Sequence, residues 1–424
     1  MSDLLIENVR LIDPASQMDQ VGALLVRDGK IIDLGPALGR PDGVPTLDGG
    51  GCVLCPGLVD MRADLGEPGS EFRETVASAA LAASAGGITT VAALPDSKPA
   101  IDDPALVRLL RARGEETGRI TVLPYGAVTR GCRGEEMSEI GLLSEAGAVA
   151  FTDGARAIGS ARMMRTALAY AMAFGMRIVQ HPEDPELARG GAATQGELAT
   201  RLGLPSIPAA AEAILVARDI RLAELTGGAV HFAHISTGEA LDLIRRAKDR
   251  GLSVTCDTAP PYFDLNETAI GAYRTFAKLS PPLRADSDRL AVVAGLADGT
   301  IDAVASDHQP RDADDKRLPF AQAAPGGVGL ATLLGVTLAQ VHGGQIGLSR
   351  AIELMTVAPA RLLKSQAGTL ARGASADLCL FDLDRVWQVN VGTLPGKSQN
   401  SPFDGRALEG RVVGTWKAGT RVFG

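Results

Sequence analysis

Short apolar runs alternate with longer amphipathic segments through most of the chain. Eight runs rich in Val, Ile, Ala and Thr have the length of strands and occupy residues 58–65, 89–95, 120–128, 148–154, 177–183, 229–237, 253–260 and 302–308. Segments suited to helices lie between them, among them 74–86, 103–118, 161–175 and 238–251. Strands that alternate with helices in this way predict an α/β fold, a (β/α)8 TIM barrel over residues 57–360.

The two ends of the chain follow a different pattern, with short β-like runs separated by turn residues. Residues 4–13 and 22–35 form such runs near the start, and Asp28-Gly29 is typical of a two-residue hairpin turn. Residues 376–384, 410–419 and 420–424 repeat the pattern near the end. We therefore expect residues 1–56 and 361–424 to pair in one small β-rich accessory domain.

Polar residues gather where the predicted barrel strands end. They are Asp60, Arg62, Asp64, Asp96, Asp153, His181, His234 and Asp307. Active sites of such barrels are built at the carboxyl ends of the strands, so these side chains predict a shared site. The charged segment 311–320 is expected to be a loop that crosses the mouth of the barrel.

Composition narrows the classes of protein that fit. The net charge of −8 gives no reason to expect a nucleic acid or an anionic membrane as a partner. No apolar run reaches the roughly 18 residues of a membrane-spanning helix, and the first residues lack the pattern of a signal peptide, so a cytoplasmic location is expected. The 5 cysteines are scattered, and Cys52 and Cys55 are interpreted as small apolar residues that enter the first barrel strand.

Several motifs carry a resemblance to a known family. They are PGLVDMRADLGEPG (56–69), FTDG (151–154), HPEDPEL (181–187), HISTGEALDLIRRAK (234–248), KLSPPLR (278–284) and IDAVASDHQP (301–310). In this order, and over nearly the whole chain, they resemble the dihydroorotases, the pyrimidine-pathway members of the amidohydrolase superfamily. The resemblance implies that Asp153, His181 and His234 are metal ligands and that Asp307 is both a ligand and the catalytic general base.

The first strand departs from the family at the metal. The family motif Asp-x-His-x-His is here Asp60-Met61-Arg62-Ala63-Asp64. Guanidinium has no lone pair to donate to zinc, whereas Asp64 could still act as a ligand or form an ion pair with Arg62. Asp153, His181, His234 and Asp307 would hold at most one zinc ion.

The family's substrate-binding positions are altered as well. Its arginine two residues after the second histidine is Gly66, and the asparagine of its Asn-Thr-x-Pro motif is Asp96 in PDSKP (95–99). A further asparagine is Ser280 in KLSPPLR, and a histidine near strand eight is Arg311. Losing an arginine that grips a carboxylate removes a contact worth about 1.5–3 kcal/mol.

Three functions remain open. The first is a dihydroorotase-like protein of de novo pyrimidine biosynthesis that is weakly active or noncatalytic and acts as a partner of aspartate carbamoyltransferase, a partner that the resemblance implies. The second is an active one-zinc dihydroorotase that interconverts N-carbamoyl-L-aspartate and (S)-dihydroorotate, and the third is a hydrolase of another cyclic amide or imide. A homo-oligomer or a hetero-complex is expected.

We further expect the guanidinium of Arg62 to take the place of the metal and to neutralise the four carboxylates of Asp60, Asp64, Asp153 and Asp307, because buried like charges are costly unless they are paired.

Overall fold

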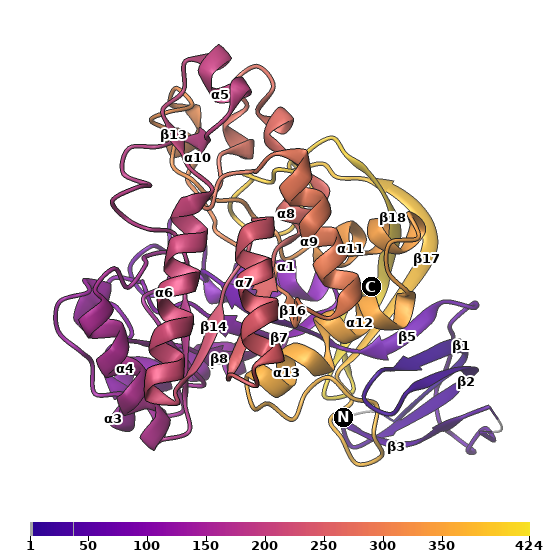
Figure 1. Ribbon diagram of the computed structural model, residues 1–424. Coiled ribbons are helices and arrows are strands. Elements are labelled where there is room, and N and C mark those ends of the chain that lie inside the picture. Colours follow the sequence, from indigo (N-terminus) through magenta and orange to yellow (C-terminus); the bar gives the residue numbers. More distant parts are fainter. Residues whose placement is uncertain (1–2, 37) are drawn as a thin grey trace.

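The computed structural model describes residues 3–36 and 38–424, and strands from both ends of the chain share one mixed sheet (Figure 1). Its order is β19-β18-β17-β5-β1-β2-β3, and β4 pairs with β1. The strands of this terminal sheet are β1 (Leu4–Asp13), β2 (Met18–Arg27), β3 (Lys30–Gly35), β4 (Thr46–Asp48), β5 (Val53–Pro56), β17 (Leu378–Gln388), β18 (Ala407–Lys417) and β19 (Thr420–Phe423). The two termini therefore contact each other through backbone pairing.

This sheet tests two of the predictions made from the sequence. Asp28 and Gly29 have φ of 49° and 76° between β2 and β3, as a type I′ hairpin turn requires, so that prediction is confirmed. Cys55 was expected to enter the first barrel strand, and this is wrong. It lies in β5 of the terminal sheet, opposite Cys379 of β17, because the chain breaks its strand at Gly57.

A second set of strands pairs in parallel, each strand with its neighbour in the order of the chain. The strands are β6 (Leu58–Ala63), β7 (Ile88–Ala93), β8 (Thr121–Pro124), β9 (Gly126–Ala127), β10 (Phe151–Thr152), β11 (Arg177–Gln180), β14 (Ala229–Phe232), β15 (Val254–Thr258) and β16 (Ala303–Val304). Only Tyr125 separates β8 from β9, and a parallel bridge between Ala63 and His308 joins the last strand segment to the first. Each predicted strand thus overlaps an observed one, and together they form a closed parallel circuit.

The helices of the described residues are α1 (Val76–Ala85), α2 (Pro104–Thr117), α3 (Ile140–Glu145), α4 (Ala161–Ala173), α5 (Glu197–Leu202), α6 (Ala210–Thr226), α7 (Gly238–Asp249), α8 (Pro260–Asp264), α9 (Asp286–Asp298), α10 (Ala313–Arg317), α11 (Leu333–His342), α12 (Leu348–Met355) and α13 (Val357–Leu362). Long helices such as α6 and α7 cover the outside of this circuit, whereas α5 and α10 lie near the top of Figure 1, away from the strands of the circuit. Short pieces complete the chain: β12 (Ala193–Thr194), β13 (Ser206–Ile207) and the 3₁₀ turns Arg130–Cys132, Glu267–Ile270 and Thr275–Ala277.

The four helices expected from the sequence begin at residues whose side chains cap them. Thr75, Asp103, Ser160 and Thr237 each accept a hydrogen bond from a backbone N–H of the first turn of α1, α2, α4 and α7. The segment 311–320 is not wholly a loop, because it contains α10, whose first turn is capped in the same way by Asp312.

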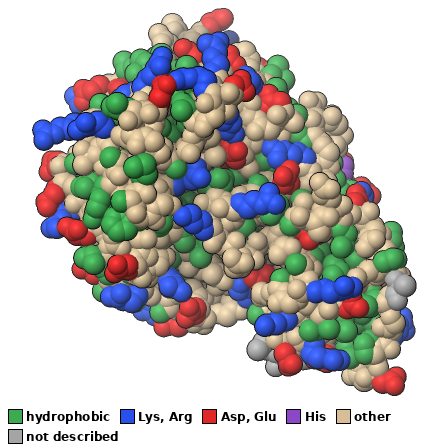
Figure 2. Space-filling view, turned by 60° about the horizontal axis from the view of Figure 1, so that its bottom comes forward, with side chains coloured by type: hydrophobic (Ala, Val, Ile, Leu, Met, Phe, Trp, Pro, Cys, Tyr) green, Lys and Arg blue, Asp and Glu red, His purple; other side chains and the backbone are tan. Residues whose placement is uncertain are grey.

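Apolar packing joins these parts. One cluster lies between the strands and the helices, and a smaller one fills the inside of the circuit with mostly small side chains such as Ala92, Ala233 and Ala305. Figure 2 shows the molecule from below, where cationic and anionic side chains are interspersed over the surface. Within residues 3–36 and 38–424, no helix is long and apolar enough to cross a membrane.

Candidate active site

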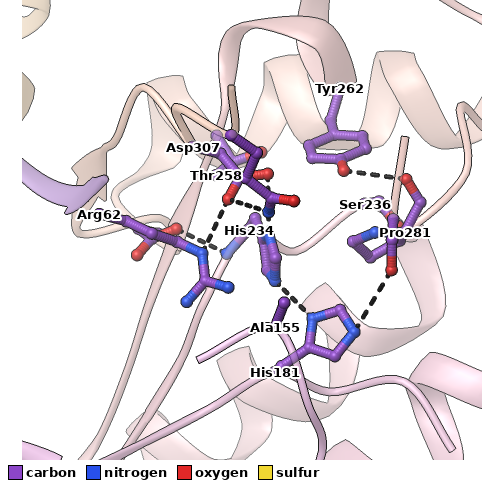
Figure 3. A network of polar contacts seen from close by, with 12 residues as sticks. Arg62, Ala155, His181, His234, Ser236, Thr258, Tyr262, Pro281 and Asp307 are labelled. Atoms are coloured by element: carbon purple, nitrogen blue, oxygen red, sulfur yellow. Dashed lines mark hydrogen bonds and ion pairs between the residues drawn. The ribbon is translucent and has the colours of Figure 1, made fainter. Parts of the chain in front are cut away.

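Arg62, near the end of β6, lies at one end of the buried polar network that Figure 3 shows. It is 1% exposed, its Nε donates to Asp307 Oδ1 at 2.8 Å, and its Nη2 donates to the Gly154 carbonyl at 3.1 Å. Burial opposes its charge, but Asp307 and Asp257 outweigh burial and raise the pKa of Arg62. The guanidinium is therefore a permanent cation inside the fold, with its Nη1 left without a hydrogen-bond partner.

A chain of titratable groups continues from this ion pair. Asp307 Oδ2 lies 3.2 Å from Nδ1 of His234, although that nitrogen lacks hydrogen-bond geometry, and Nε2 of His234 lies 2.7 Å from Nδ1 of His181. Burial and the neighbouring Arg62 lower the pKa of His234 to about 4, so its ring is neutral at neutral pH. Burial would raise the pKa of Asp307, but His234 and Arg62 overcome it and hold that pKa well below its usual range.

The chain ends at a carboxylate that sequence analysis missed. Ser280 Oγ donates to Glu183 Oε2 at 3.1 Å and lies 3.5 Å from His181 Nε2, while Glu183 itself lies 3.8 Å from that nitrogen. Glu183 is buried, and its pKa is lowered because His181, Arg284 and Ser280 together outweigh desolvation. The signal was present in HPED, where an acidic residue follows the histidine by two positions.

Asp153 makes its own hydrogen bonds away from this chain. Its carboxylate accepts from the backbone N–H of Thr129 at 2.9 Å and from the Thr129 hydroxyl at 2.5 Å. Burial raises its pKa, and Asp96 adds to the increase. The carboxylate of Asp153 does not contact Arg62, but the carbonyl oxygen of the next residue, Gly154, accepts a hydrogen bond from it. A hydrogen bond thus links His181 to His234, and a close contact of 3.2 Å joins His234 to Asp307.

Arg62 does not neutralise four carboxylates as expected. Among the described residues its one ion pair is with Asp307, and Asp64 does not pair with it. Asp60 instead accepts from the N–H and hydroxyl of Ser306, and desolvation raises its pKa to about 6. Asp64 accepts from the Gly66 N–H at 2.9 Å. The acids of this strand are held by separate hydrogen bonds, which compete with Arg62 for them.

Three of the four altered substrate positions line one pocket of about 220 Å³, namely Gly66, Asp96 and Arg311, together with Asp64. Gly66 has φ of 72°, and a Cβ there would lie 2.1 Å from the carbonyl oxygen of Glu74. A side chain at this position would force the backbone to move, so the family's arginine has no room here. Burial and the neighbouring Asp96 raise the pKa of Asp64. Ser280 lies apart, beside His181.

A parallel circuit wrapped by helices, with histidines and acids at the carboxyl ends of its strands, defines a protein with the amidohydrolase fold. L-hydantoinase from Arthrobacter aurescens superimposes with a TM-score of 0.89 and 25% identity over 100% of this chain and 96% of that one. A dihydropyrimidinase from Brevibacillus agri gives a TM-score of 0.84 at 22% identity, over 99% of this chain and 95% of its own.

Comparison with proteins of similar sequence places the chain in one family within this class. The model of the dihydro-orotase-like family matches residues 51–240. A dihydroorotase of Pelobacter propionicus is 44% identical over 99% of both chains, and one of Anaeromyxobacter sp. (strain K) is 45% identical over 100% of this chain and 98% of its own. This chain belongs to the dihydroorotase family.

The family is generally metal-dependent, but the residues of this chain do not fit a catalytic zinc. A tetrahedral site needs several lone pairs directed at one point. Here His181 and His234 are directed at each other, Asp307 holds Arg62, and Asp153 holds Thr129. Within residues 3–36 and 38–424, no group of three or more His, Cys, Asp or Glu side chains could hold a metal ion.

Proposed function

We propose that this chain is a noncatalytic or at most weakly active member of the dihydroorotase family, which serves de novo pyrimidine biosynthesis as a partner of aspartate carbamoyltransferase. The observation that carries the proposal is the buried ion pair of Arg62 with Asp307. A cation is already bound to the carboxylate that would otherwise serve as metal ligand and general base.

The charge state of Asp307 supports weak or absent turnover. A general base works best when its pKa is near the working pH. The pKa of Asp307 lies well below its usual range because His234 and Arg62 favour the ionised form. Proton abstraction from an attacking water by this carboxylate is therefore unfavourable.

The substrate pocket supports the same proposal. N-carbamoyl-L-aspartate carries two carboxylates, while Asp64 and Asp96 line the pocket and Gly66 excludes an arginine. Arg311 lines the pocket, but its Nε and Nη2 donate to the Pro325 carbonyl and Gln309. A dianion would meet the carboxylates of Asp64 and Asp96, while the cations Arg73 and Lys98 line the same pocket and would offset part of that repulsion.

Activity is tested by dihydroorotate ring opening, with the zinc content measured on the same protein. The native chain should contain little zinc and turn over slowly, if at all. Arg62→His combined with Asp64→His restores the family motif and should bind more zinc with little gain in activity, because Gly66 and Asp96 remain. Stoichiometric zinc with rapid turnover in the native chain would overturn the proposal.

Partnership is tested by co-expression with the aspartate carbamoyltransferase of the same organism, followed by size-exclusion chromatography. Joint elution, and a change in carbamoyltransferase activity when this chain is omitted, are expected. Separate elution and unchanged activity would refute the partnership while leaving the activity test untouched.

The second candidate is an active dihydroorotase with a single zinc ion, bound by Asp153, His181, His234 and Asp307 with Asp307 as the base. The names of the relatives at 44% and 45% identity favour it. Action on another cyclic amide is favoured by the likeness to L-hydantoinase. Assays with dihydroorotate and with hydantoins separate these two functions.

We also propose that residues 57–360 form a complete (β/α)8 barrel and that residues 1–56 and 361–424 form an accessory domain. The closed order of parallel strands supports the barrel, and the terminal sheet supports the accessory domain. Helix α13, Val357–Leu362, crosses the expected boundary between residues 360 and 361. The junction between barrel and accessory domain therefore lies just after this helix.

A further inference from the structure

A second cavity, of about 330 Å³, lies beside α10, which is drawn near the top of Figure 1. We call it the α10 cavity. The lining residues that matter for its chemistry are Phe72, Phe276, Arg311, Lys316, Lys397 and Asn400. Phe72 and Arg311 also line the pocket with Asp64 and Asp96, so they stand between the two spaces. None of the family motifs accounts for the α10 cavity.

Lys316 is an unusual side chain for this position. It is 4% exposed, and its Nζ donates only to the carbonyls of Thr275 at 3.1 Å and Lys278 at 3.3 Å. Lysines are seldom fully buried unless a carboxylate pairs with them. Among the described residues, no carboxylate lies within ion-pair distance of Lys316. Lys316 therefore lines the cavity as a buried amine that no carboxylate pairs with among the described residues.

Two neighbouring cations lie close to this amine. Arg311 and Lys278 also lack an ion pair among the residues that the structure describes, and Lys278 donates to the Ala321 carbonyl at 2.9 Å. Desolvation and the charges of Arg311 and Lys278 together lower the pKa of Lys316 to about 7, against a smaller opposing effect of Asp315. Buried like charges of this kind are costly without a counter-ion.

The nearby acids do not cancel the charge. Asp312 lines the cavity, but its Oδ1 accepts from the Asp314 N–H as the cap of α10. Arg317 also lines the cavity and pairs with Asp314 at an exposed edge, and Asp315 pairs with Arg73. The lining is thus cationic overall.

Two aromatic rings give the cavity an apolar side. Phe72 is 62% exposed, and Phe276 lies on the lining as well. These two rings supply the apolar part of a lining that is otherwise mostly polar and charged.

We propose that the α10 cavity binds a small organic anion, with its anionic head near Lys316 and Lys397 and its planar or apolar body against Phe72 and Phe276. The cavity shares Phe72 and Arg311 with the pocket of Asp64 and Asp96, but the Arg62 network does not line it.

Binding is tested by isothermal titration calorimetry on the full chain with three probes. Sulfate supplies the anionic head alone, benzenesulfonate adds a ring, and benzylamine carries the ring with the opposite charge. Benzenesulfonate should bind more tightly than sulfate, and benzylamine should not bind. Dissociation constants above about 10 mM for both anions would overturn the proposal.

Variants locate the site. Lys316→Met keeps the length of the side chain and should weaken binding of both anions by about tenfold or more, the loss expected for a charge-assisted contact. Lys397→Met, at an exposed position, should also weaken both and serves as the second variant if Lys316→Met does not fold. Phe276→Ala should weaken benzenesulfonate alone.

The matched control is Lys364→Met. Lys364 is exposed, and its Nζ donates to the Gly175 carbonyl, far from α10. It should bind both anions like the native chain. Equal binding by native protein, Lys316→Met and Lys397→Met would place any anion elsewhere and refute the site.

Discussion

Replacing Arg62 with methionine tests the central ion pair of this fold. The side chain is 1% exposed, and methionine keeps most of its stem while removing the guanidinium. Asp307 then loses its hydrogen bond at 2.8 Å, and Gly154 loses one at 3.1 Å. Removing one partner of a buried pair costs about 3–5 kcal/mol, because the other charge stays buried without compensation. We expect Arg62→Met to lower the free energy of unfolding by that amount.

A second substitution separates charge from packing. Asp307→Asn in the Arg62→Met background removes the uncompensated carboxylate, so it should recover about 2 kcal/mol or more. The exposed pair of Arg10 and Asp19, 2.7 Å apart, provides the control. Arg10→Met should cost no more than about 1 kcal/mol, since solvent screens that pair.

The assay is urea denaturation at pH 7, followed by far-ultraviolet circular dichroism and by tryptophan fluorescence. Circular dichroism reports mostly on the helices around the circuit, whereas Trp387 and Trp416 lie in the terminal sheet. Native-like spectra before denaturation establish that each variant folds. A cost below about 1 kcal/mol for Arg62→Met, or no recovery in the double variant, would refute the reasoning.

The pH dependence supplies an independent check. The folded pKa of Asp307 lies below its ordinary value of 3.8, so its stabilising contribution is present above pH 3.8 and is lost as the pH falls through the folded pKa. Arg62→Met weakens the cause of that shift. The variant should therefore lose less stability than the native chain when the pH is lowered into this range.

Three further outcomes are expected. Asp60 has a folded pKa of about 6, above its ordinary 3.8, so the stability of the native chain should fall as the pH rises from 3.8 to about 6. Melting curves of Asp60→Asn over the same pH range should show a smaller loss of stability. Gly66→Ala should cost about 2 kcal/mol or more in thermal unfolding, since its Cβ would lie 2.1 Å from the Glu74 carbonyl oxygen; a melting temperature like that of the native chain would contradict the geometry. Lys316 has a folded pKa of about 7 against an ordinary 10.5, so the stability of the native chain should rise as the pH increases above 7. Lys316→Met should be more stable than the native chain at pH 6, and its stability should not show this rise.

The local sequence predicted most of the secondary structure. Each predicted strand of the parallel circuit overlaps an observed one, and the helices at 74–86, 103–118, 161–175 and 238–251 begin at the capping residues that their sequences supply. The hairpin at Asp28-Gly29 follows from two residues that tolerate positive φ. The exceptions were short: α10 lies where a loop was expected, and Cys55 belongs to the terminal sheet.

The candidate site was only partly predictable. The sequence by itself determined which residue types stand at the strand ends, including Arg62 at a position where the family resemblance implies a zinc ligand. Tertiary structure decided the pairing: Asp307, 245 residues away, takes Arg62, while Asp60 is held by Ser306 and Asp153 by Thr129. It also brought Glu183 to the end of the histidine chain through Ser280. The physical reason is that the charge of a buried carboxylate and the partner that holds it depend on desolvation and on donors supplied by distant strands, which local sequence does not specify.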